Sequence, residues 1–119
     1  MIANSVNIMG TKWEIILRKR KDDPDLKGIW GYCDNTTKTI VIRKQHDTPQ
    51  RNECSDLREL ERSLLRHEIV HAFLFESGLA SDSSGAEHWA KTEEIVDWIA
   101  QQHQKIHMAF IEAGAIEIE

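Results

Sequence analysis

The residues with the clearest chemical potential are His67, Glu68 and His71, within the run Leu65-Arg66-His67-Glu68-Ile69-Val70-His71-Ala72-Phe73. Residues four apart on a helix lie about 40° apart around the axis and about 6 Å along it, so both imidazoles can reach one ion. Zinc binds such neutral nitrogens at about 2.0–2.1 Å. Glu68 projects beside the ion, where a carboxylate can take a proton from a zinc-bound water. The motif predicts a zinc cofactor with His67 and His71 as ligands and Glu68 as general base.

A catalytic zinc site needs a third protein ligand and one position left for water. The candidates are Glu87, His88, Glu93, Glu94, Asp97, His103 and His107. On a helix, His103 and His107 lie about 15 Å and about 21 Å along the axis from Glu93, so neither can share an ion with it. Glu93 and Asp97 are one turn apart. Glu93 can therefore bind the metal while Asp97 accepts a ring N–H from a ligating histidine.

Three residues keep alternative roles at this stage. Glu94 is the main alternative to Glu93, because a small shift of the helix would present it instead. If residues 84–87 form a capping box, His88 is helical and lies about 140° around the axis from Glu93. If the helix starts later, His88 stands on a loop and can polarise a substrate carbonyl. Tyr32, the only tyrosine, is either an oxyanion donor or a packed strand residue.

Two helices must position these side chains. The first is predicted from a cap at Ser55 or Asp56 to a stop at Gly78, because apolar residues recur along one side of it. The two histidines of the motif continue its apolar line, so they are expected to face the interior. The second helix is predicted from about Glu87 or Ala90 to Ala113. Its expected apolar side consists of Trp89, Val96, Ile99, Ala100 and Phe110.

The region before the first helix is predicted to form strands. Apolar residues alternate over 13–18, which is the period of a half-buried strand, and the acidic and proline-containing residues 22–25 break it as a turn. Residues 28–33 and 38–43 flank a short polar loop at 34–37, which indicates a hairpin. The predicted fold class is α+β: one domain over 1–119, with about three antiparallel strands packed on the helix that carries the histidines.

The composition limits the classes of function. A chain of 119 residues is too short for a separate substrate-binding lobe, so any active site should be an open groove. The net charge of −5 argues against nucleic acid as the main partner, and the basic run 18–21 is expected to be a solvated strand end. Cys33 and Cys54 are too few for a disulfide framework. With no membrane span or signal peptide in the pattern, a cytoplasmic protein with reduced thiols is expected.

The His67–His71 motif is followed about 20 residues later by Thr92-Glu93-Glu94-Ile95-Val96-Asp97. This combination resembles the gluzincin class of zinc peptidases. In that class a helical glutamate is the third ligand and an aspartate four residues later orients a ligating histidine. The run Glu93-Glu94-Ile95-Val96-Asp97-Trp98-Ile99-Ala100 is similar to the helix of ImmA/IrrE-like metallopeptidases of phages and mobile elements. This resemblance covers about residues 60–104 well and the strands loosely. It implies a zincin-like minimal domain. Members of that family often carry an extra helix and sometimes a DNA-binding or sensor domain, and a chain of this length is expected to hold neither.

Together these observations predict a zinc-dependent hydrolase of peptide bonds. An edge strand beside the groove can hold an extended peptide by β-addition, so protein or peptide substrates are favoured over small amides. The alternative is a metal-binding interaction module of a phage or mobile element that binds a partner without proteolysis. A third interpretation, a structural domain without metal, predicts no bound zinc. Whether Glu68→Gln abolishes the biological effect discriminates the first two.

Overall fold

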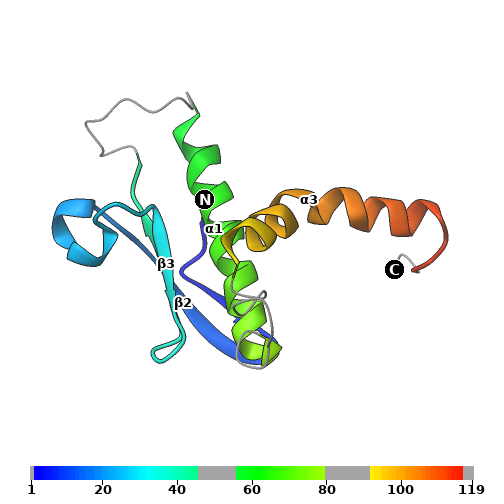
Figure 1. Ribbon diagram of the computed structural model, residues 1–119, viewed down its shortest axis with the longest axis horizontal. Helices are drawn as coiled ribbons and strands as arrows, with labels where there is room; N and C mark the ends of the chain where they lie inside the picture. Colours follow the sequence, from blue (N-terminus) through cyan, green and yellow to red (C-terminus); the bar gives the residue numbers. More distant parts are fainter. Residues whose placement is uncertain (1, 46–55, 80–91, 117–119) are drawn as a thin grey trace.

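The computed structural model describes residues 2–45, 56–79 and 92–116. Helix α1 lies against one side of a sheet, and helix α3 starts beside α1 and runs away from it (Figure 1). The elements are β1 (Ser5–Ile8), β2 (Thr11–Arg18), the 3₁₀ turns η1 (Arg20–Asp22) and η2 (Pro24–Leu26), β3 (Gly31–Asp34), β4 (Thr39–Arg43), α1 (Leu57–Glu76) and α3 (Glu93–Glu112). The predicted α+β class is confirmed.

The sheet has the strand order β1-β2-β4-β3 and is mixed, because β2 pairs with β4 in parallel while the two outer pairs are antiparallel. The prediction of three antiparallel strands is therefore wrong in number and in direction. The reason lies in β4, where Ile40, Val41 and Ile42 are each at most 1% exposed. Such an unbroken apolar run needs a central place with strands on both sides. The predicted hairpin of β3 and β4 is confirmed. Its second strand, β4, pairs with β2, and β3 lies at the edge.

The additional strand is β1, which a two-residue turn joins to β2. Met9 and Gly10 in this turn have φ angles of 51° and 92°, the left-handed pair that hairpins with two-residue loops favour. Asn7 Oδ1 accepts a hydrogen bond from Gly10 N at 2.8 Å. The sequence signal for β1 was the alternation of Val6 and Ile8 with polar neighbours, but it is only four residues long.

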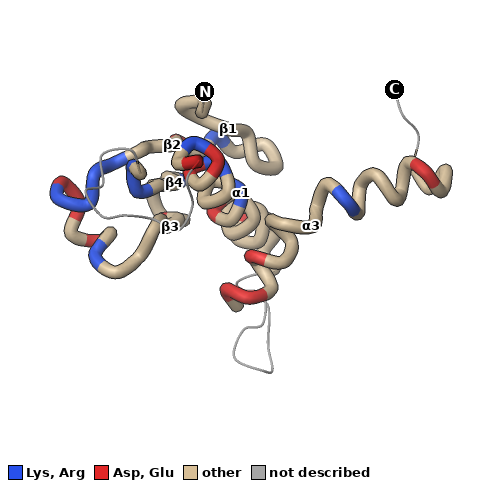
Figure 2. Tube along the Cα trace, turned by 90° about the horizontal axis from the view of Figure 1, so that it is seen from above, with Lys and Arg blue, Asp and Glu red and all other residues tan. Residues whose placement is uncertain are grey.

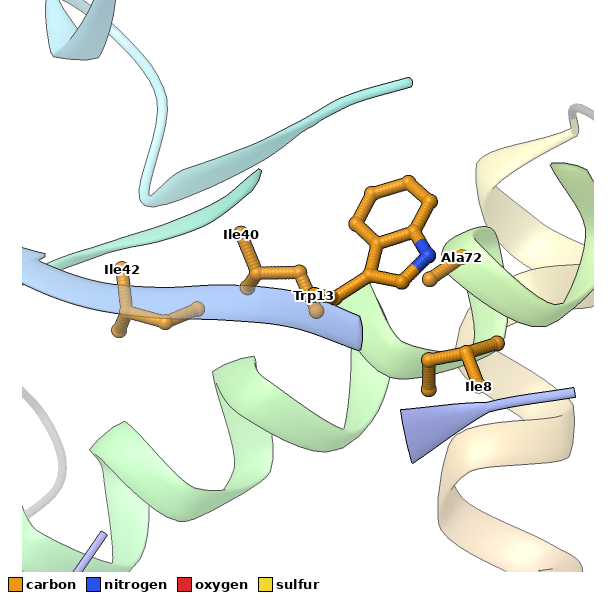
Figure 3. Close-up of a cluster of buried hydrophobic side chains, with 5 residues drawn as sticks. All are labelled: Ile8, Trp13, Ile40, Ile42 and Ala72. Carbon is orange, nitrogen blue, oxygen red and sulfur yellow. The ribbon is translucent and has the colours of Figure 1, made fainter. Parts of the chain in front are cut away.

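Helix α1 begins and ends where the sequence predicts. Asp56 is the N-cap, and its side chain accepts a hydrogen bond from Glu59 N at 3.0 Å. At the other end Ser77 is the C-cap, and Gly78 takes the left-handed φ of 82° that commonly ends a helix. Between these caps the helix packs on the sheet. Figure 3 shows the shared core, which consists of Ile8, Trp13, Ile40, Ile42 and Ala72.

A polar contact at the end of α1 fixes the helix over the sheet. Trp13, fully buried on β2, donates from its indole Nε1 to Glu76 Oε2 at 2.8 Å. Lys38 in the hairpin turn approaches the same oxygen at 3.0 Å and stands 5.3 Å from the centre of the Trp13 ring. A strand, a turn and the helix thus meet at one carboxylate, which restrains the rotation of α1 about its axis.

Helix α3 begins later than predicted. Thr92 is the N-cap with extended angles of φ −66° and ψ 123°, so the helix starts at Glu93, and the predicted start at Glu87 or Ala90 is wrong. Two glutamates in its first turn suit the positive end of the helix dipole. The end near Ala113 is confirmed. The predicted linker and Trp89 lie outside the described residues.

The apolar side of α3 is buried only near its start. Val96 and Ala100 are 0% and 4% exposed, whereas Phe110, predicted on the same side, is 48% exposed. The reason is that the C-terminal half of α3 extends beyond α1 and the sheet (Figure 1). No helix in the described part of the chain is long and apolar enough to cross a membrane.

Candidate metal centre

Helix α1 presents both histidines of the motif toward the start of α3. The side chains of His67 and His71 are 17% and 13% exposed, so they face inward as predicted. Their ring centres are 4.9 Å apart and the ring planes meet at 66°. One turn of helix thus places the two imidazoles side by side.

Glu93, the first residue of α3, lies between the two rings. Its Oε2 is 2.8 Å from His67 Nε2, and its Oε1 is 2.9 Å from His71 Nε2. One ligand atom from each of the three residues lies within 4.8 Å of the others, and within residues 2–45, 56–79 and 92–116 no other trio of His, Cys, Asp or Glu does so. Asp97 Oδ1 is 3.4 Å from His67 Nδ1. The structure therefore brings together the four residues predicted as ligands and orienting carboxylate.

The other candidate ligands are placed elsewhere. Glu94 is exposed and does not belong to the trio, so the register of α3 presents Glu93 to the histidines. His103 and His107 are also outside the trio, as the helix rise predicts, and His103 Nδ1 instead lies 3.0 Å from the carbonyl oxygen of Ala100. His88 lies outside the described residues.

The donor set suits a divalent cation. In His67, Nε2 faces the Glu93 carboxylate and Nδ1 faces the Asp97 carboxylate. A neutral imidazole donates from one nitrogen and presents a lone pair at the other. If Nδ1 donates to Asp97, the lone pair of Nε2 points at the Glu93 carboxylate, and these two groups repel. A second proton on the ring, or a cation between Nε2 and the carboxylate, makes the contact favourable. His71 adds a second nitrogen there, and burial lowers the pKa of this imidazole, which favours its neutral form.

Glu68 forms the buried carboxyl group of the site. It is 7% exposed, and burial raises the pKa of its carboxyl to about 7. It lies under β3 at Gly31, where an added Cβ would stand 3.5 Å from Glu68 Oε2 and 2.9 Å from the carbonyl oxygen of Val41. Sequence reasoning missed Gly31, where the carbonyl oxygen of Val41 in the neighbouring strand β4 leaves no room for a Cβ, while Glu68 would lie at ordinary contact distance.

A groove of about 660 Å³ joins these residues. One wall is the segment from η2 into β3, and the other consists of α1 and the start of α3. Its lining residues are Gly28, Ile29, Trp30, Gly31, Tyr32, Cys33, Ser63, Leu64, His67, Glu68, His71, Phe75, Glu93 and Asp97. The expected open groove is therefore present.

Tyr32 lines the groove, but its hydroxyl is bound elsewhere. It donates to Asp23 Oδ2 at 2.6 Å, and Arg18 Nη1 donates to the same oxygen at 3.1 Å. Burial, followed by the Asp23 carboxylate, raises the pKa of Tyr32 to about 12. The hydrogen bond from Tyr32 is in turn the main cause that lowers the pKa of Asp23. Of the two sequence-based roles, this geometry favours the packed strand residue over the oxyanion donor.

Comparisons with models of protein families, with curated proteins and with solved structures gave no match to this chain.

Proposed function

We propose that this chain is a zinc-dependent peptidase with a zincin-like, gluzincin-type site related to ImmA/IrrE-like enzymes. The observation that carries the proposal is the convergence of His67 Nε2, His71 Nε2 and the Glu93 carboxylate beside the buried Glu68 in an open groove. In this proposal His67, His71 and Glu93 hold the ion. Zinc, when bound there, supplies a Lewis acid that polarises a carbonyl and lowers the pKa of water.

The proposed mechanism gives Glu68 and Asp97 separate roles. Glu68 accepts a proton from water on its carboxylate and passes it to the leaving amine. Asp97 orients the His67 ring by accepting from Nδ1, which keeps Nε2 directed at the centre. Burial beneath β3 leaves Glu68 only 7% exposed, which limits the contact of its carboxylate with bulk water.

A peptide is the substrate that fits this arrangement best. Strand β3 is an outer strand of the sheet and also a wall of the groove. An extended peptide can pair with its backbone by β-addition and so lie alongside Glu68. The free thiol of Cys33 is compatible with the cytoplasmic location that we expect.

The test combines metal analysis with a peptidase assay on Glu68→Gln. We expect about one equivalent of zinc in both the wild type and the variant, and hydrolysis of a mixed peptide library by the wild type alone. The expected loss is about 10²–10⁴-fold, because the amide keeps the shape but accepts no proton. His103→Ala is the matched control, a histidine on α3 outside the trio, and should change neither result.

Each contrary outcome has a distinct meaning. A wild-type chain that takes up no zinc when offered it contradicts the metal centre. Loss of zinc in Glu68→Gln would make Glu68 a ligand, and unchanged turnover would move the general base elsewhere. Zinc binding without hydrolysis of any peptide would favour the interaction module over the peptidase.

A further inference from the structure

The wall opposite the histidines contains an apolar surface that the proposed mechanism does not use. Ile29 and Trp30 lie between η2 and β3 and line the same groove as His67 and Glu68. They remain 42% and 43% exposed. Large apolar side chains with this exposure in a concave site are typical of surfaces that contact a ligand.

This wall is held in place by its neighbours. Ile29 N donates to the carbonyl oxygen of the fully buried Leu26 at 3.2 Å. Arg43 N donates to the carbonyl oxygen of Trp30 at 2.8 Å, and the Arg43 guanidinium carbon stands 5.4 Å from the centre of the Trp30 ring. Gly28 makes the preceding turn with a φ of +79°. A ligand that uses this wall therefore meets a surface whose backbone is already ordered, which lowers the entropy cost of binding.

The wall lies next to the candidate reaction centre along the strand. Trp30 directly precedes Gly31, the residue whose backbone passes over Glu68. Consecutive Cα atoms are about 3.8 Å apart, so the Cα atoms of Trp30 and Ile29 lie at most about 4 Å and 8 Å from that of Gly31. A peptide paired with β3 would place on this wall a side chain one or two residues from the bond that is cut.

The charges around the wall select against ionised side chains. The Arg43 guanidinium already occupies one face of the Trp30 ring, so a second cation there meets a like charge. The groove is also lined by the carboxyl groups of Glu68 and Asp97, which the ion does not bind and which disfavour an acidic side chain. A large uncharged side chain is repelled neither by the Arg43 guanidinium nor by the carboxyl groups.

We propose that Ile29 and Trp30 form a specificity subsite that selects a large apolar side chain, such as leucine or phenylalanine, one or two residues from the scissile bond of a peptide. This proposal rests on the proposed peptidase function and names its substrate class. The residues are specificity determinants, since they contact substrate without taking part in proton transfer.

The first experiment measures cleavage. The zinc-loaded wild type is incubated with a randomised peptide library, and the cut sites are identified by mass spectrometry. We expect leucine, phenylalanine and similar residues to be enriched within two positions of the cut. Matched peptides with leucine, serine, lysine or aspartate at the enriched position then give kcat/KM values, and we expect the leucine peptide to exceed the others about ten-fold or more.

The second experiment measures binding without turnover. Fluorescence anisotropy gives the Kd of the same labelled peptides for Glu68→Gln, and we expect the leucine peptide to bind more tightly than the serine peptide. Adding Trp30→Ala or Ile29→Ser to this protein should remove most of that difference while leaving the serine peptide unchanged. Phe110→Ala, a similarly exposed aromatic on the far part of α3, is the matched control and should keep the preference. Circular dichroism identifies any variant that fails to fold. If either Trp30→Ala or Ile29→Ser does not fold, the other variant tests the proposal.

The outcomes separate this proposal from the function on which it rests. Cleavage without enrichment of apolar residues, or a preference that survives in both Trp30→Ala and Ile29→Ser, overturns the subsite and leaves the peptidase intact. Absence of cleavage by the wild type, together with tighter binding of the leucine peptide that depends on Trp30, overturns the peptidase and keeps the wall as an apolar binding surface. Equal binding of all four peptides overturns the subsite independently of activity.

Discussion

The two helices contribute to the candidate site in different ways. On α1 the side chains of His67 and His71 are 17% and 13% exposed, and the helix packs along the sheet through a shared core. On α3 the side chains of Glu93 and Asp97 are 73% and 51% exposed. Val96 and Ala100 are the two buried residues of α3, and they hold this end of the helix in place. The half of the site on α1, with His67 and His71, is therefore part of the core, and we call it the built half. The half on α3, with Glu93 and Asp97, packs onto that core, and we call it the docked half.

This difference suggests how the affinity for a metal should be distributed. The α1 pair is ordered by the fold before any ligand binds, so it contributes with little entropy cost. The side chains of the α3 carboxylates are mostly exposed to water, and their place depends on the contact between α3 and α1. Figure 2 shows acidic residues at the start of α3, below α1 in this view and next to the grey trace. We expect mutations on α1 to remove the site and mutations on α3 to weaken it.

The largest expected effect is therefore on α1. His71→Ala should reduce bound zinc from about one equivalent to background, because it leaves one imidazole and one exposed carboxylate. Glu93→Ala should lower the affinity less, since α1 still presents both imidazoles. Titration against a chromophoric chelator measures both variants. A greater loss in Glu93→Ala than in His71→Ala would contradict the division between a built and a docked half.

A smaller effect is expected at the orienting carboxylate. Asp97→Ala should lower zinc affinity by about 10–100-fold, the usual cost of removing the partner of a ligating histidine. Glu94→Ala, an exposed glutamate of the same helix outside the trio, is the matched control and should change affinity little. If Glu94→Ala releases the metal and Glu93→Ala does not, the register of α3 differs by one residue from the one described.

The same division explains what the sequence could predict. The limits of α1 and the inward direction of the two histidines follow from capping residues and helix periodicity, which are local. The position of Glu93 beside them was inferred from spacing on a single helix, and its register stayed open against Glu94 because only packing between helices settles it. The start of α3 was predicted at about Glu87 or Ala90, with a later start left open for His88, and the structure places the N-cap at Thr92.

The errors in the sheet have a similar cause. Alternation identified the strand that contains Trp13 and the hairpin that leads into Ile40–Ile42, because both signals lie within a few residues. Strand order is a property of the whole sheet. Nothing local to β2 indicates that its neighbour is β4 in parallel. Gly31 could not be recognised for the same reason, since its role depends on how closely the backbone of β4 approaches it at Val41.

Packing on the docked half provides a third test. Val96→Ala removes two fully buried methyl groups from α3 and should lower the free energy of unfolding by about 1.5 kcal/mol. Because Val96 lies one turn from Glu93, it should also weaken zinc binding several-fold. Ile40→Val in the sheet core is the control, with a stability cost of about 0.5–1.5 kcal/mol and no change in affinity. Urea titration and chelator competition measure the two quantities, and equal affinities in both variants would show that α3 docking does not position Glu93.

The smallest expected effect lies outside the metal centre, at the buried Asp23 carboxylate that accepts a hydrogen bond from the Tyr32 hydroxyl of β3. The Tyr32 hydroxyl is the main cause that lowers the pKa of Asp23, so the ionised form of Asp23 stabilises the folded state. A lowered pKa contributes stability above the ordinary carboxyl value of about 4, and this contribution is lost as the pH falls through the folded pKa. Tyr32→Phe should therefore be less stable than the wild type at pH 7, and the difference should shrink at pH 3. Urea midpoints at pH 7, 5 and 3 measure it, with Asp23→Asn as the control in which Tyr32→Phe should have no such pH-dependent effect. A difference between wild type and Tyr32→Phe that stays constant or grows in acid would mean that the hydrogen bond does not act through the ionised carboxylate.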